Sequence, residues 1–488
     1  MPAKALPGAA TPAPSAKGPI PLVVDLDDTL VRTDLLLESL FVLAKQKPLR
    51  LLLVPLWLAK GKACLKRRLA EMAMPDIAAL PYRQALLSRL EAERRRGRPL
   101  VLATAADQAL ADEVARHLGL FDAVLASDGT VNLARELKRE RLVEEYGAQG
   151  FDYVGGGHSD QPVWHAARRV WVLRAGPRLA AEAAEAADVE TIVDDDPPRL
   201  ASYLATLRPH QWLKNALVFL PLLATRRIYE LDLLWQGLLV FAAFSLCASS
   251  AYILNDLLDL PSDRHHPRKR NRPFASGEVP LLHGLALAPL LLLVGLVLGA
   301  LLSPLLLGVL ALYYALTLSY SLRLKDIVIL DVLALAGLYT LRVMAGAVAF
   351  GIPPSAWLLA FCGFLFFSLA MIKRYAELMA MRTLEGSRAH ARAYLLEDSE
   401  LLAALGGASG YLSVLVLALY ITSEAMHDPD VRYQLIWLVC VLLLYWISYM
   451  WLMAHRGRMH DDPLVFALRN RVSQVVIALM AATLLIAA

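Results

Sequence analysis

The residues best suited to chemistry form an acidic cluster between Asn255 and Asp263, where a long apolar run ends. Asp256, Asp259 and Asp263 are spaced three and then four residues apart, so a helix would place them on one face. Three carboxylates gathered at a membrane surface repel one another unless a cation neutralises them, and Mg²⁺ prefers such oxygen ligands. We therefore predict a magnesium site formed by Asn255, Asp256, Asp259 and Asp263.

Basic residues follow the acidic cluster directly, and basic side chains bind phosphate groups well. They are Arg264, Arg268, Lys269, Arg270 and Arg272. Acidic residues for a metal beside basic residues for phosphate predict a site for Mg²⁺ and a diphosphate, facing the cytoplasm. The alternative is that the basic residues only set the orientation of a protein with several membrane spans.

The composition divides the 488-residue chain into two parts. Hydrophobic residues make up 57% of the chain and charged residues 19%, with a mean hydropathy of +0.47, and most of the apolar mass follows residue 208. We expect a disordered tail over 1–19, a soluble domain over 20–200 and a membrane domain over 201–488. The net charge of +4 gives no reason to expect nucleic acid, and the four cysteines lack pairing or metal-ligand spacing.

Nine apolar segments approach the ~20 residues that are needed to cross a bilayer, so we predict nine spans. They are 212–226, 233–254, 283–302, 304–322, 327–350, 355–374, 407–424, 433–453 and 470–488. The loops expected outside carry few basic residues, namely Arg226, Arg227 and Arg432. By the positive-inside rule, both expected active sites therefore face the cytoplasm. Arg342 lies within a span, where burial costs ~2.5–3.5 kcal/mol, so it should either contact substrate or pair within the bundle, where Asp331 could face the same cavity.

The acidic cluster resembles the first aspartate-rich motif of the UbiA superfamily of intramembrane prenyltransferases. Residues 208–215 resemble the entry to that family's first helix, and 320–325 resemble its motif between the fourth and fifth helices. The resemblance covers residues 205–488 and implies an all-α, UbiA-like transmembrane bundle. It adds further residues to the expected substrate-binding set, namely Lys214, Asn215, Tyr320 and Lys325. Arg342 joins this set because of its charge within a span.

The loop after the sixth span departs from members that prenylate aromatic rings, which carry a second acidic cluster there. The segment Lys373-Arg374-Tyr375-Ala376-Glu377 instead resembles the decaprenyl-phosphate phosphoribosyltransferase branch. The resemblance implies transfer of 5-phosphoribose from phosphoribosyl pyrophosphate (PRPP) to a polyprenyl phosphate, with Mg²⁺ as cofactor. It also implies that Lys373, Arg374 and Glu377 contact substrate. The alternative is a conventional prenyltransferase that uses a prenyl diphosphate and carries a regulatory N-terminal domain.

In the soluble part, the apolar strand 22–24 is followed by Asp25 and Asp27. Side chains two apart in a strand point the same way, so these carboxyl groups should project together. One can attack phosphorus while the other transfers protons. A second apolar strand ends at Thr104, Lys138 lies in a helical stretch, and a third strand leads to Asp160.

This order of motifs resembles the haloacid dehalogenase (HAD) superfamily and implies an α/β, Rossmann-like fold over 20–200, with a helical cap over 34–95. The resemblance implies that Asp25 is the nucleophile, Asp27 the general acid and base, and that Thr104 and Lys138 hold the phosphoryl oxygens. It implies that Mg²⁺ binds Asp25, Asp160 and the carbonyl of Asp27. Gly156 stands where many relatives have another acid, so an inactive regulatory domain is the alternative.

Within the expected cap, residues 48–59 are strongly apolar and are followed by basic residues. This pattern is typical of a helix on a membrane surface, and equally of a buried cap helix. An active N-terminal domain could remove the 5-phosphate from the transferase product, which would supply a polyprenyl-phosphoryl ribose for glycan assembly. The segment 194–198 is expected to link the two domains.

Overall fold

The computed structural model describes residues 19–173, 177–192, 199–225, 227–385, 390–391, 394–422, 433–459 and 462–487. The expected tail, apart from residue 19, and the expected linker at 194–198 lie outside these ranges. The chain divides into two compact units. The first comprises residues up to 206 together with 256–285, and the second comprises 207–255 together with 286–488. The acidic cluster thus groups, after Asn255, with the N-terminal residues.

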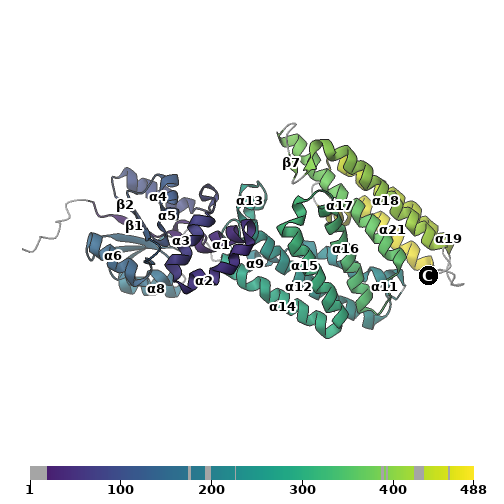
Figure 1. Cartoon of the computed structure of the whole chain (residues 1–488), viewed down its shortest axis with the longest axis horizontal. Coiled ribbons are helices and arrows are strands. Elements are labelled where there is room, and N and C mark those ends of the chain that lie inside the picture. The colour runs from purple at the N-terminus through teal and green to yellow at the C-terminus, as the bar shows by residue number, and fades with distance from the viewer. Residues whose placement is uncertain are drawn as a thin grey trace, which may run out of the picture. The chain divides into compact units, whose positions relative to one another are not determined.

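The first unit contains a six-stranded parallel sheet with the strand order β3-β2-β1-β4-β5-β6. Its strands are β1 (Leu22–Val24), β2 (Leu100–Asp107), β3 (Ala123–Ser127), β4 (Asp152–Gly155), β5 (Arg169–Leu173) and β6 (Asp188–Ile192). Helices α4 (Gln84–Arg95) and α5 (Gln108–Leu118) cover one face, and α6 (Glu136–Tyr146) and α8 (Pro177–Ala186) cover the other (Figure 1). This arrangement confirms the expected α/β domain with a parallel sheet.

Side chains along β1 point alternately to the two faces of the sheet, and helices cover both faces. Leu22 and Val24 belong to the apolar cluster under α4 and α5, whereas Val23 belongs to the cluster under α6 and α8. All three side chains are fully buried. A continuous apolar strand is therefore needed here, as in other parallel sheets that are covered on both sides.

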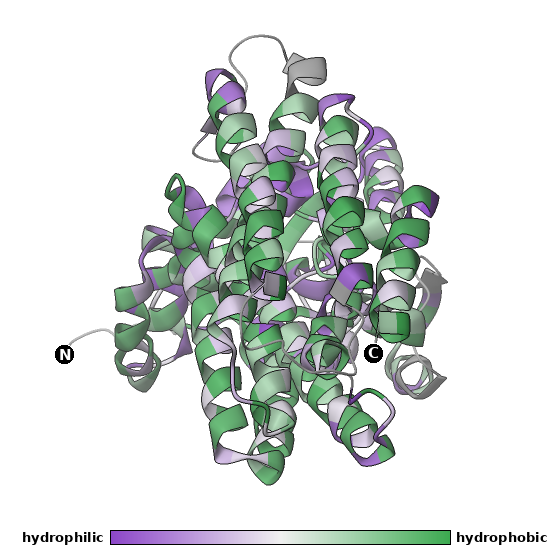
Figure 2. Cartoon of the chain, turned by 90° about the vertical axis from the view of Figure 1, so that its right-hand side faces the viewer, coloured by the Kyte–Doolittle hydropathy of each residue, from purple (hydrophilic) through white to green (hydrophobic). Residues whose placement is uncertain are grey.

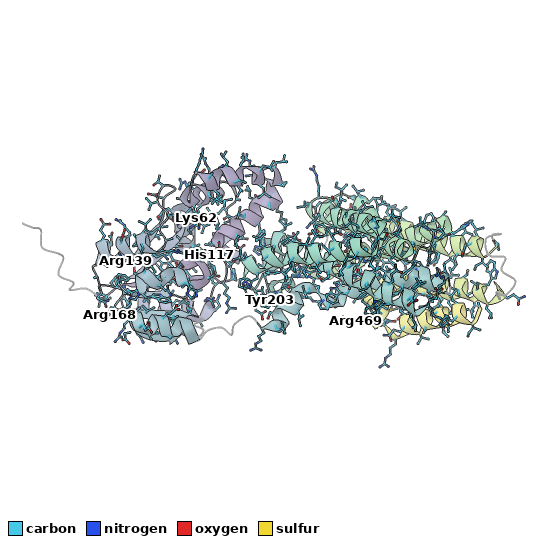
Figure 3. The ribbon with its side chains drawn as sticks, turned by 90° about the horizontal axis from the view of Figure 1, so that it is seen from below. Lys62, His117, Arg139, Arg168, Tyr203 and Arg469 are labelled. Carbon is cyan, nitrogen blue, oxygen red and sulfur yellow. The ribbon has the colours of Figure 1, made fainter. Side chains whose placement is uncertain are left out.

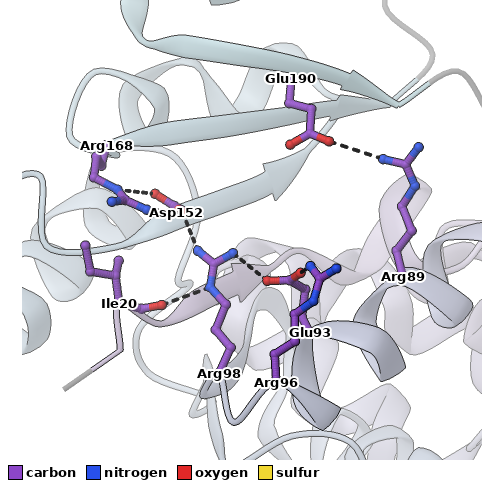
Figure 4. Close-up of polar contacts among 8 residues, drawn as sticks. All are labelled: Ile20, Arg89, Glu93, Arg96, Arg98, Asp152, Arg168 and Glu190. Atoms are coloured by element: carbon purple, nitrogen blue, oxygen red, sulfur yellow. Dashed lines mark hydrogen bonds and ion pairs between the residues drawn. The ribbon is translucent and has the colours of Figure 1, made fainter.

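Ion pairs hold the starts of the strands together (Figure 4). Asp152, at the start of β4, accepts hydrogen bonds from Arg98 and from Arg168, whose Nε lies 2.9 Å from Asp152 Oδ1. Arg98 Nε also donates to the carbonyl of Ile20, just before β1, at 2.9 Å. These contacts fix one edge of the sheet, and the opposite edge, where the strands end, carries the candidate catalytic residues.

The cap lies between β1 and β2. It consists of α1 (Leu35–Gln46), η2 (Pro48–Leu53), α2 (Val54–Ala59), α3 (Lys62–Met72) and η3 (Ile77–Ala79). Asp34 caps the start of α1 by accepting hydrogen bonds from the backbone of Leu36 and Leu37. Helix α4 falls inside the expected cap range but packs against the sheet through Leu86 and Leu90.

The second unit is all-α, as expected. It contains most of α12 (Leu231–Leu258) and α14 (Leu281–Leu302), with α15 (Pro304–Leu322), α16 (Leu330–Ala349), α17 (Ala356–Glu385), α18 (Ser399–Thr422), α19 (Tyr433–His455), α20 (Pro463–Arg469) and α21 (Arg471–Ala487). Hydrophobic residues line most of the length of the long helices (Figure 2). Among the described residues, seven helices are long and apolar enough to cross a membrane, or eight if α20 and α21, bent by 86°, form one span. The predicted count of nine is not reached.

The first predicted span, 212–226, accounts for part of this difference. Its residues form three short pieces, namely α10 (Pro209–Trp212), η5 (Leu213–Phe219) and α11 (Leu220–Ala224). Pro221 stands in the first turn of α11 and has no backbone N–H to continue the helix before it. Gly346 of α16 packs closely on this segment, since a Cβ at that position would lie 1.9 Å from the Val218 carbonyl oxygen.

Candidate active sites

Asp25 follows β1 directly, and its carboxylate is held from two sides. Lys138 Nζ, from α6, donates to Asp25 Oδ1 at 2.7 Å, and Thr29 Oγ1 donates to Asp25 Oδ2 at 3.1 Å. All three side chains are buried. Burial raises the pKa of Asp25 to about 6, although the nearby Lys138 ammonium lowers it. At neutral pH Asp25 is therefore mostly ionised, as a nucleophile must be.

Asp27 lies two residues further on, in extended backbone. Its Oδ1 accepts a hydrogen bond from the backbone N–H of Leu35, the first residue of α1, at 2.9 Å. Burial and, to a smaller extent, the neighbouring Asp34 carboxylate together raise the pKa of Asp27 to about 8. A carboxyl group that keeps its proton at neutral pH can serve as a general acid. The environments of Asp25 and Asp27 thus suit the two different roles that we predicted.

The structure brings Asp160 to the same place. Its Oδ1 lies 3.5 Å from Lys138 Nζ and accepts a hydrogen bond from the hydroxyl of Tyr153 at 2.8 Å. Lys138 also donates to that hydroxyl, at 3.1 Å. We did not predict Tyr153, although a tyrosine inside an apolar strand just before the glycine motif was a usable signal. Thr104 is fully buried in β2, and its hydroxyl oxygen accepts a hydrogen bond from the Ala106 N–H at 3.0 Å.

The oxygen donors near Lys138 match Mg²⁺ in type. They are the carboxylates of Asp25 and Asp160, together with the backbone carbonyl of Asp27, two residues after Asp25. A third acid has no room at Gly156, because a Cβ there would lie 2.7 Å from the Leu173 carbonyl oxygen. Within the described ranges, no three His, Cys, Asp or Glu residues are grouped so as to hold a metal ion. The site could therefore offer an ion two carboxylates and otherwise neutral oxygen donors.

A small cavity lies beside Asp27, between the cap and the sheet. Its volume is about 20 Å³, and Lys66, Ser39 and Asp107 contribute to its lining. Such a volume holds a water molecule but is too small for a sugar phosphate. Lys66 Nζ, from α3, donates to the Ala105 carbonyl at 2.6 Å, and burial lowers the pKa of this lysine.

The acidic cluster near residue 256 does not form one helical face, so that part of our prediction is wrong. Helix α12 ends at Leu258, and α13 (Leu260–His265) begins with Pro261 in its first turn. Asp259 caps α13 in a non-helical conformation, with φ −97° and ψ 9°. The helical spacing is broken at the middle aspartate, because Pro261 has no backbone N–H with which to continue α12 beyond this point, so a new helix begins at Leu260.

Two of the three aspartates still meet. Arg272 Nη1 donates to Asp256 Oδ1 at 3.1 Å and also donates to Asp263. Asp259 instead pairs with Lys45 Nζ, in the last turn of α1, at 2.7 Å. The paired carboxylates of Asp256 and Asp263 surround a cationic nitrogen, so their donor type and position suit a divalent cation. Asn255 lies on α12, in the second unit.

The basic belt after the acidic cluster divides into buried and exposed members. Arg264 forms a two-point ion pair with Glu38 of α1, and both side chains are almost fully buried. Three other members are exposed, namely Arg268, Lys269 and Arg270, whereas Arg272 is partly buried and pairs with Asp256 and Asp263. Arg264 is therefore a structural residue of the first unit in this structure rather than a free phosphate ligand.

In the second unit, one carboxylate brings together two of the predicted cations. Lys214 Nζ of η5 and Lys373 Nζ of α17 both contact Asp462 Oδ2, at 2.7 Å and 3.3 Å. The hydroxyl of Tyr339 donates to the same oxygen at 3.1 Å. We did not predict Asp462, although an aspartate before a proline is typical of a helix start, and Asp462 indeed caps α20.

Arg374 is locked in a second buried network. Its guanidinium donates to Asp331 and to the hydroxyl of Tyr320, the latter at 2.6 Å. It also donates to Glu377 at 2.5 Å. Asp331 in turn accepts a hydrogen bond from the Tyr394 hydroxyl at 2.6 Å. Three residues of the predicted substrate-binding set, Tyr320, Arg374 and Glu377, thus meet at the Arg374 guanidinium.

Arg342 pairs within the bundle, which was one of our two alternatives. Its Nε donates to Asn215 Oδ1 at 2.8 Å and its Nη2 donates to the Tyr313 hydroxyl at 3.1 Å. It does not pair with Asp331, whose partners lie on other helices. Lys325 lies in the short helix η7 (Leu324–Asp326) and is half-buried.

The fold and these clusters agree with two matched families. Residues 216–472 match the UbiA prenyltransferase family, and residues 22–165 match the haloacid dehalogenase-like hydrolases. The chain belongs to the UbiA prenyltransferase family and carries a HAD-like domain at its N-terminus.

The chain is also similar to several individual proteins. The chain is 36% identical over 477 residues to the uncharacterized protein y4nM of Sinorhizobium fredii, covering 96% of this chain and 91% of that protein. It is 37% identical over 278 residues to the nodulation protein NoeC of Azorhizobium caulinodans, covering 57% and 90%. It is 36% identical over 200 residues to the decaprenyl-phosphate phosphoribosyltransferase of Mycobacterium tuberculosis, covering 40% and 66%. A solved UbiA homolog from Archaeoglobus fulgidus with GPP and Mg²⁺ covers 58% of this chain and 99% of its own, at 17% identity and a TM-score of 0.45.

Proposed function

We propose that this chain catalyses two consecutive reactions. The UbiA part transfers 5-phosphoribose from PRPP to a polyprenyl phosphate, and the HAD-like part then removes the 5-phosphate. The product is a polyprenyl-phosphoryl ribose, a lipid-linked pentose suited to glycan assembly. The similarity to decaprenyl-phosphate phosphoribosyltransferases supports the first step, and the match to HAD-like hydrolases supports the second.

The observation that carries the transferase proposal is the excess of positive charge around Asp462. Lys214 and Lys373 share this one carboxylate. Two ammonium groups and one carboxylate leave a positive charge in a largely buried place, and a substrate phosphate would neutralise it. A second site for a magnesium–diphosphate would instead need acidic residues at this position.

The transfer requires the two substrates to be positioned correctly, and it does not require a protein side chain to act as a base. An oxygen of the lipid phosphate forms a bond to the anomeric carbon while the bond from that carbon to pyrophosphate breaks. A phosphate with a second pKa of about 6 is already largely ionised at neutral pH, so no residue must remove its proton. Asp256 and Asp263, with Asp259, would hold Mg²⁺, which supplies positive charge for the departing pyrophosphate.

The phosphatase step uses Asp25 and Asp27. Asp25 attacks the phosphorus, and the bond to the ribose oxygen breaks as that oxygen takes the proton of Asp27. Asp27 then removes a proton from water, which hydrolyses the aspartyl-phosphate and restores Asp25. Lys138 and the hydroxyl of Thr104 would hold the phosphoryl oxygens.

The test uses the full chain in lipid nanodiscs with Mg²⁺, polyprenyl phosphate and radiolabelled PRPP. Wild type should form dephosphorylated lipid-ribose, and Asp25→Asn should stop at the 5-phosphate. Glu140→Gln, an exposed change on α6, is the matched control and should behave as wild type. The absence of labelled lipid from a folded wild-type protein would exclude phosphoribosyl transfer.

A second candidate is a conventional prenyltransferase with a regulatory HAD-like domain. The small volume of the cavity beside Asp27 and the lack of room for an acid at Gly156 favour a regulatory domain. In that case the protein should consume a prenyl diphosphate, ignore PRPP and release no phosphate from any sugar phosphate. Asp25→Asn would then change the rate of transfer.

A further inference from the structure

The cap carries an exposed apolar segment that the proposed chemistry does not use. This leucine segment, residues 48–59, consists of η2 followed by α2. Leu49 and Leu52 are 82% and 79% exposed, and Leu56 is 54% exposed. Leu51, Leu53 and Leu58 are also exposed. A contiguous group of exposed leucines on a folded domain marks an interaction surface.

The leucine segment is folded, and it is not the buried cap helix that was one of our two alternatives. Within this fully described segment, Trp57 is the buried residue, at 7% exposure. Its indole packs in a cluster with Val42, Leu43 and Leu65, which come from α1 and α3. The tryptophan fixes the segment to the cap, and the leucines remain on the outside.

The charges around the leucine segment point to its partner. The sequence from Lys47 to Ala70 contains no acidic residue. Three of its basic residues, Arg50, Lys60 and Lys62, are exposed, and Figure 3 labels Lys62. Exposed leucines with basic neighbours are typical of helices that lie in the headgroup region of anionic membranes. A bilayer is available to the cap as a partner, because the described part of the same chain includes seven helices that are apolar enough to span one.

We propose that the leucine segment inserts into the surface of an anionic bilayer and docks the cap on the membrane. Helix α3 follows the segment after Gly61, whose φ of +110° permits the sharp turn between them. Lys66 and Leu69 of α3 line the cavity beside Asp27. Docking therefore presents the phosphatase pocket to a phosphate that is attached to a lipid. This last consequence rests on the proposed function, whereas the docking itself does not.

The test of docking places a fluorophore on the full chain in nanodiscs that contain phosphatidylglycerol. The native cysteines are replaced, and a single label is attached through Leu52→Cys or, as matched control, through Leu137→Cys. Leu137 is also an exposed leucine, at 47%, but it lies on α6 among charged residues. Lipids with a quencher on the acyl chain should quench the label at position 52 several-fold more than the label at 137.

Three results would overturn the proposal. Equal quenching at the two positions would show that the label itself enters the lipid. Access of aqueous iodide to position 52 would place the segment in water. Protection of position 52 from both quenchers would mean that protein covers the leucines.

A second variant separates docking from catalysis. The double change Leu52→Glu/Leu56→Glu should lower phosphate release from lipid-linked phosphoribose by at least about tenfold, because the substrate loses the advantage of a shared surface. Release from soluble ribose 5-phosphate should be unchanged, which also reports that the variant is folded. An equal loss on both substrates would contradict a docking role. If wild type hydrolyses neither substrate, the proposed phosphatase fails, while the quenching result still decides whether the segment docks.

Discussion

Glu38 and Arg264, which are separated by 226 residues in sequence, form a buried two-point ion pair within the first unit. Glu38 lies on the cap helix α1, and Arg264 lies five residues after Asp259. Glu38 also accepts a hydrogen bond from Thr33 Oγ1 at 2.7 Å, and Arg264 donates to the Ala275 carbonyl at 2.9 Å. The same helix begins with Leu35, whose N–H contacts Asp27. One helix thus contacts both candidate active sites.

Breaking this pair should loosen the loop that follows Asp256. Glu38→Ala leaves the Arg264 charge buried and unpaired, which costs about 3–5 kcal/mol. We expect a lower thermal unfolding temperature and faster tryptic cleavage after the exposed residues Arg268, Lys269 and Arg270. Glu71→Ala, which removes an exposed partner of Arg67, is the control and should change stability by less than about 1 kcal/mol. Equal cleavage in the two variants would contradict a structural role for Glu38.

Lys45 should compete with a divalent cation for Asp259. Their contact is partly exposed, so the attraction is worth about 0.2–1 kcal/mol. Lys45→Met should therefore tighten Mn²⁺ binding by up to about fivefold, measured by electron paramagnetic resonance on the full chain. Lys47→Met, on an exposed lysine that contacts the Met72 carbonyl, is the matched control. Weaker Mn²⁺ binding in Lys45→Met would show that Lys45 positions Asp259 rather than competing for it.

Phosphate release should depend on pH through Asp25 and Asp27. Asp25 must lose its proton to attack, so the rate rises as the pH passes about 6, the raised pKa of that group. Asp27 must keep its proton for the leaving group, so the rate falls as the pH passes about 8. We expect a bell-shaped profile of kcat/KM with these two limbs, because that ratio reports the pKa values of the enzyme without substrate. Asp27→Asn should abolish turnover, and a wild-type rate that still rises above pH 9 would contradict the assignment.

The Asp462 carboxylate should stabilise the fold by keeping the two neighbouring lysine charges paired. Asp462→Asn leaves Lys214 and Lys373 facing each other without their carboxylate, a loss of about 3–5 kcal/mol. The variant should melt at a lower temperature, and added pyrophosphate should restore more stability to it than to wild type. Glu400→Gln, an exposed acid in the first turn of α18, should leave both quantities unchanged. Failure of pyrophosphate to stabilise either protein would argue against an anion site here.

Adding the acid that many HAD relatives carry should not improve this domain. Gly156→Asp would place a Cβ 2.7 Å from the Leu173 carbonyl oxygen, so the backbone must move. We expect a loss of stability of about 1–3 kcal/mol and no gain in metal affinity, measured by thermal unfolding with and without Mg²⁺. Gly157→Ala is a milder control, because its Cβ would mainly meet the side chain of Ser159. Tighter metal binding by Gly156→Asp would contradict this account.

The sequence by itself determined the class of both parts. Apolar strands that end in acids predicted the parallel sheet and the position of Asp25, because the carboxyl ends of parallel strands meet at one edge. Long apolar helices predicted an all-α membrane part, because their length and composition are local properties. The resemblance to the HAD superfamily also implied that Lys138 and Asp160 would share a site with Asp25, and Lys138 Nζ lies 2.7 Å from Asp25 Oδ1 and 3.5 Å from Asp160 Oδ1.

Tertiary structure decided which charges pair. Asp462 meets Lys214 across 248 residues, and Asp331 meets Arg374 rather than Arg342. Such partners depend on how helices pack, and no local period of the sequence records that packing. The partner of Asp259 is also a tertiary result, because Lys45 lies 214 residues away. The loss of helical spacing at Asp259 is instead a local effect of Pro261, which the sequence contains. The exposure of the leucine segment is likewise a tertiary result, because Trp57 and the half-buried Val54 pack into the cap core and the leucines do not.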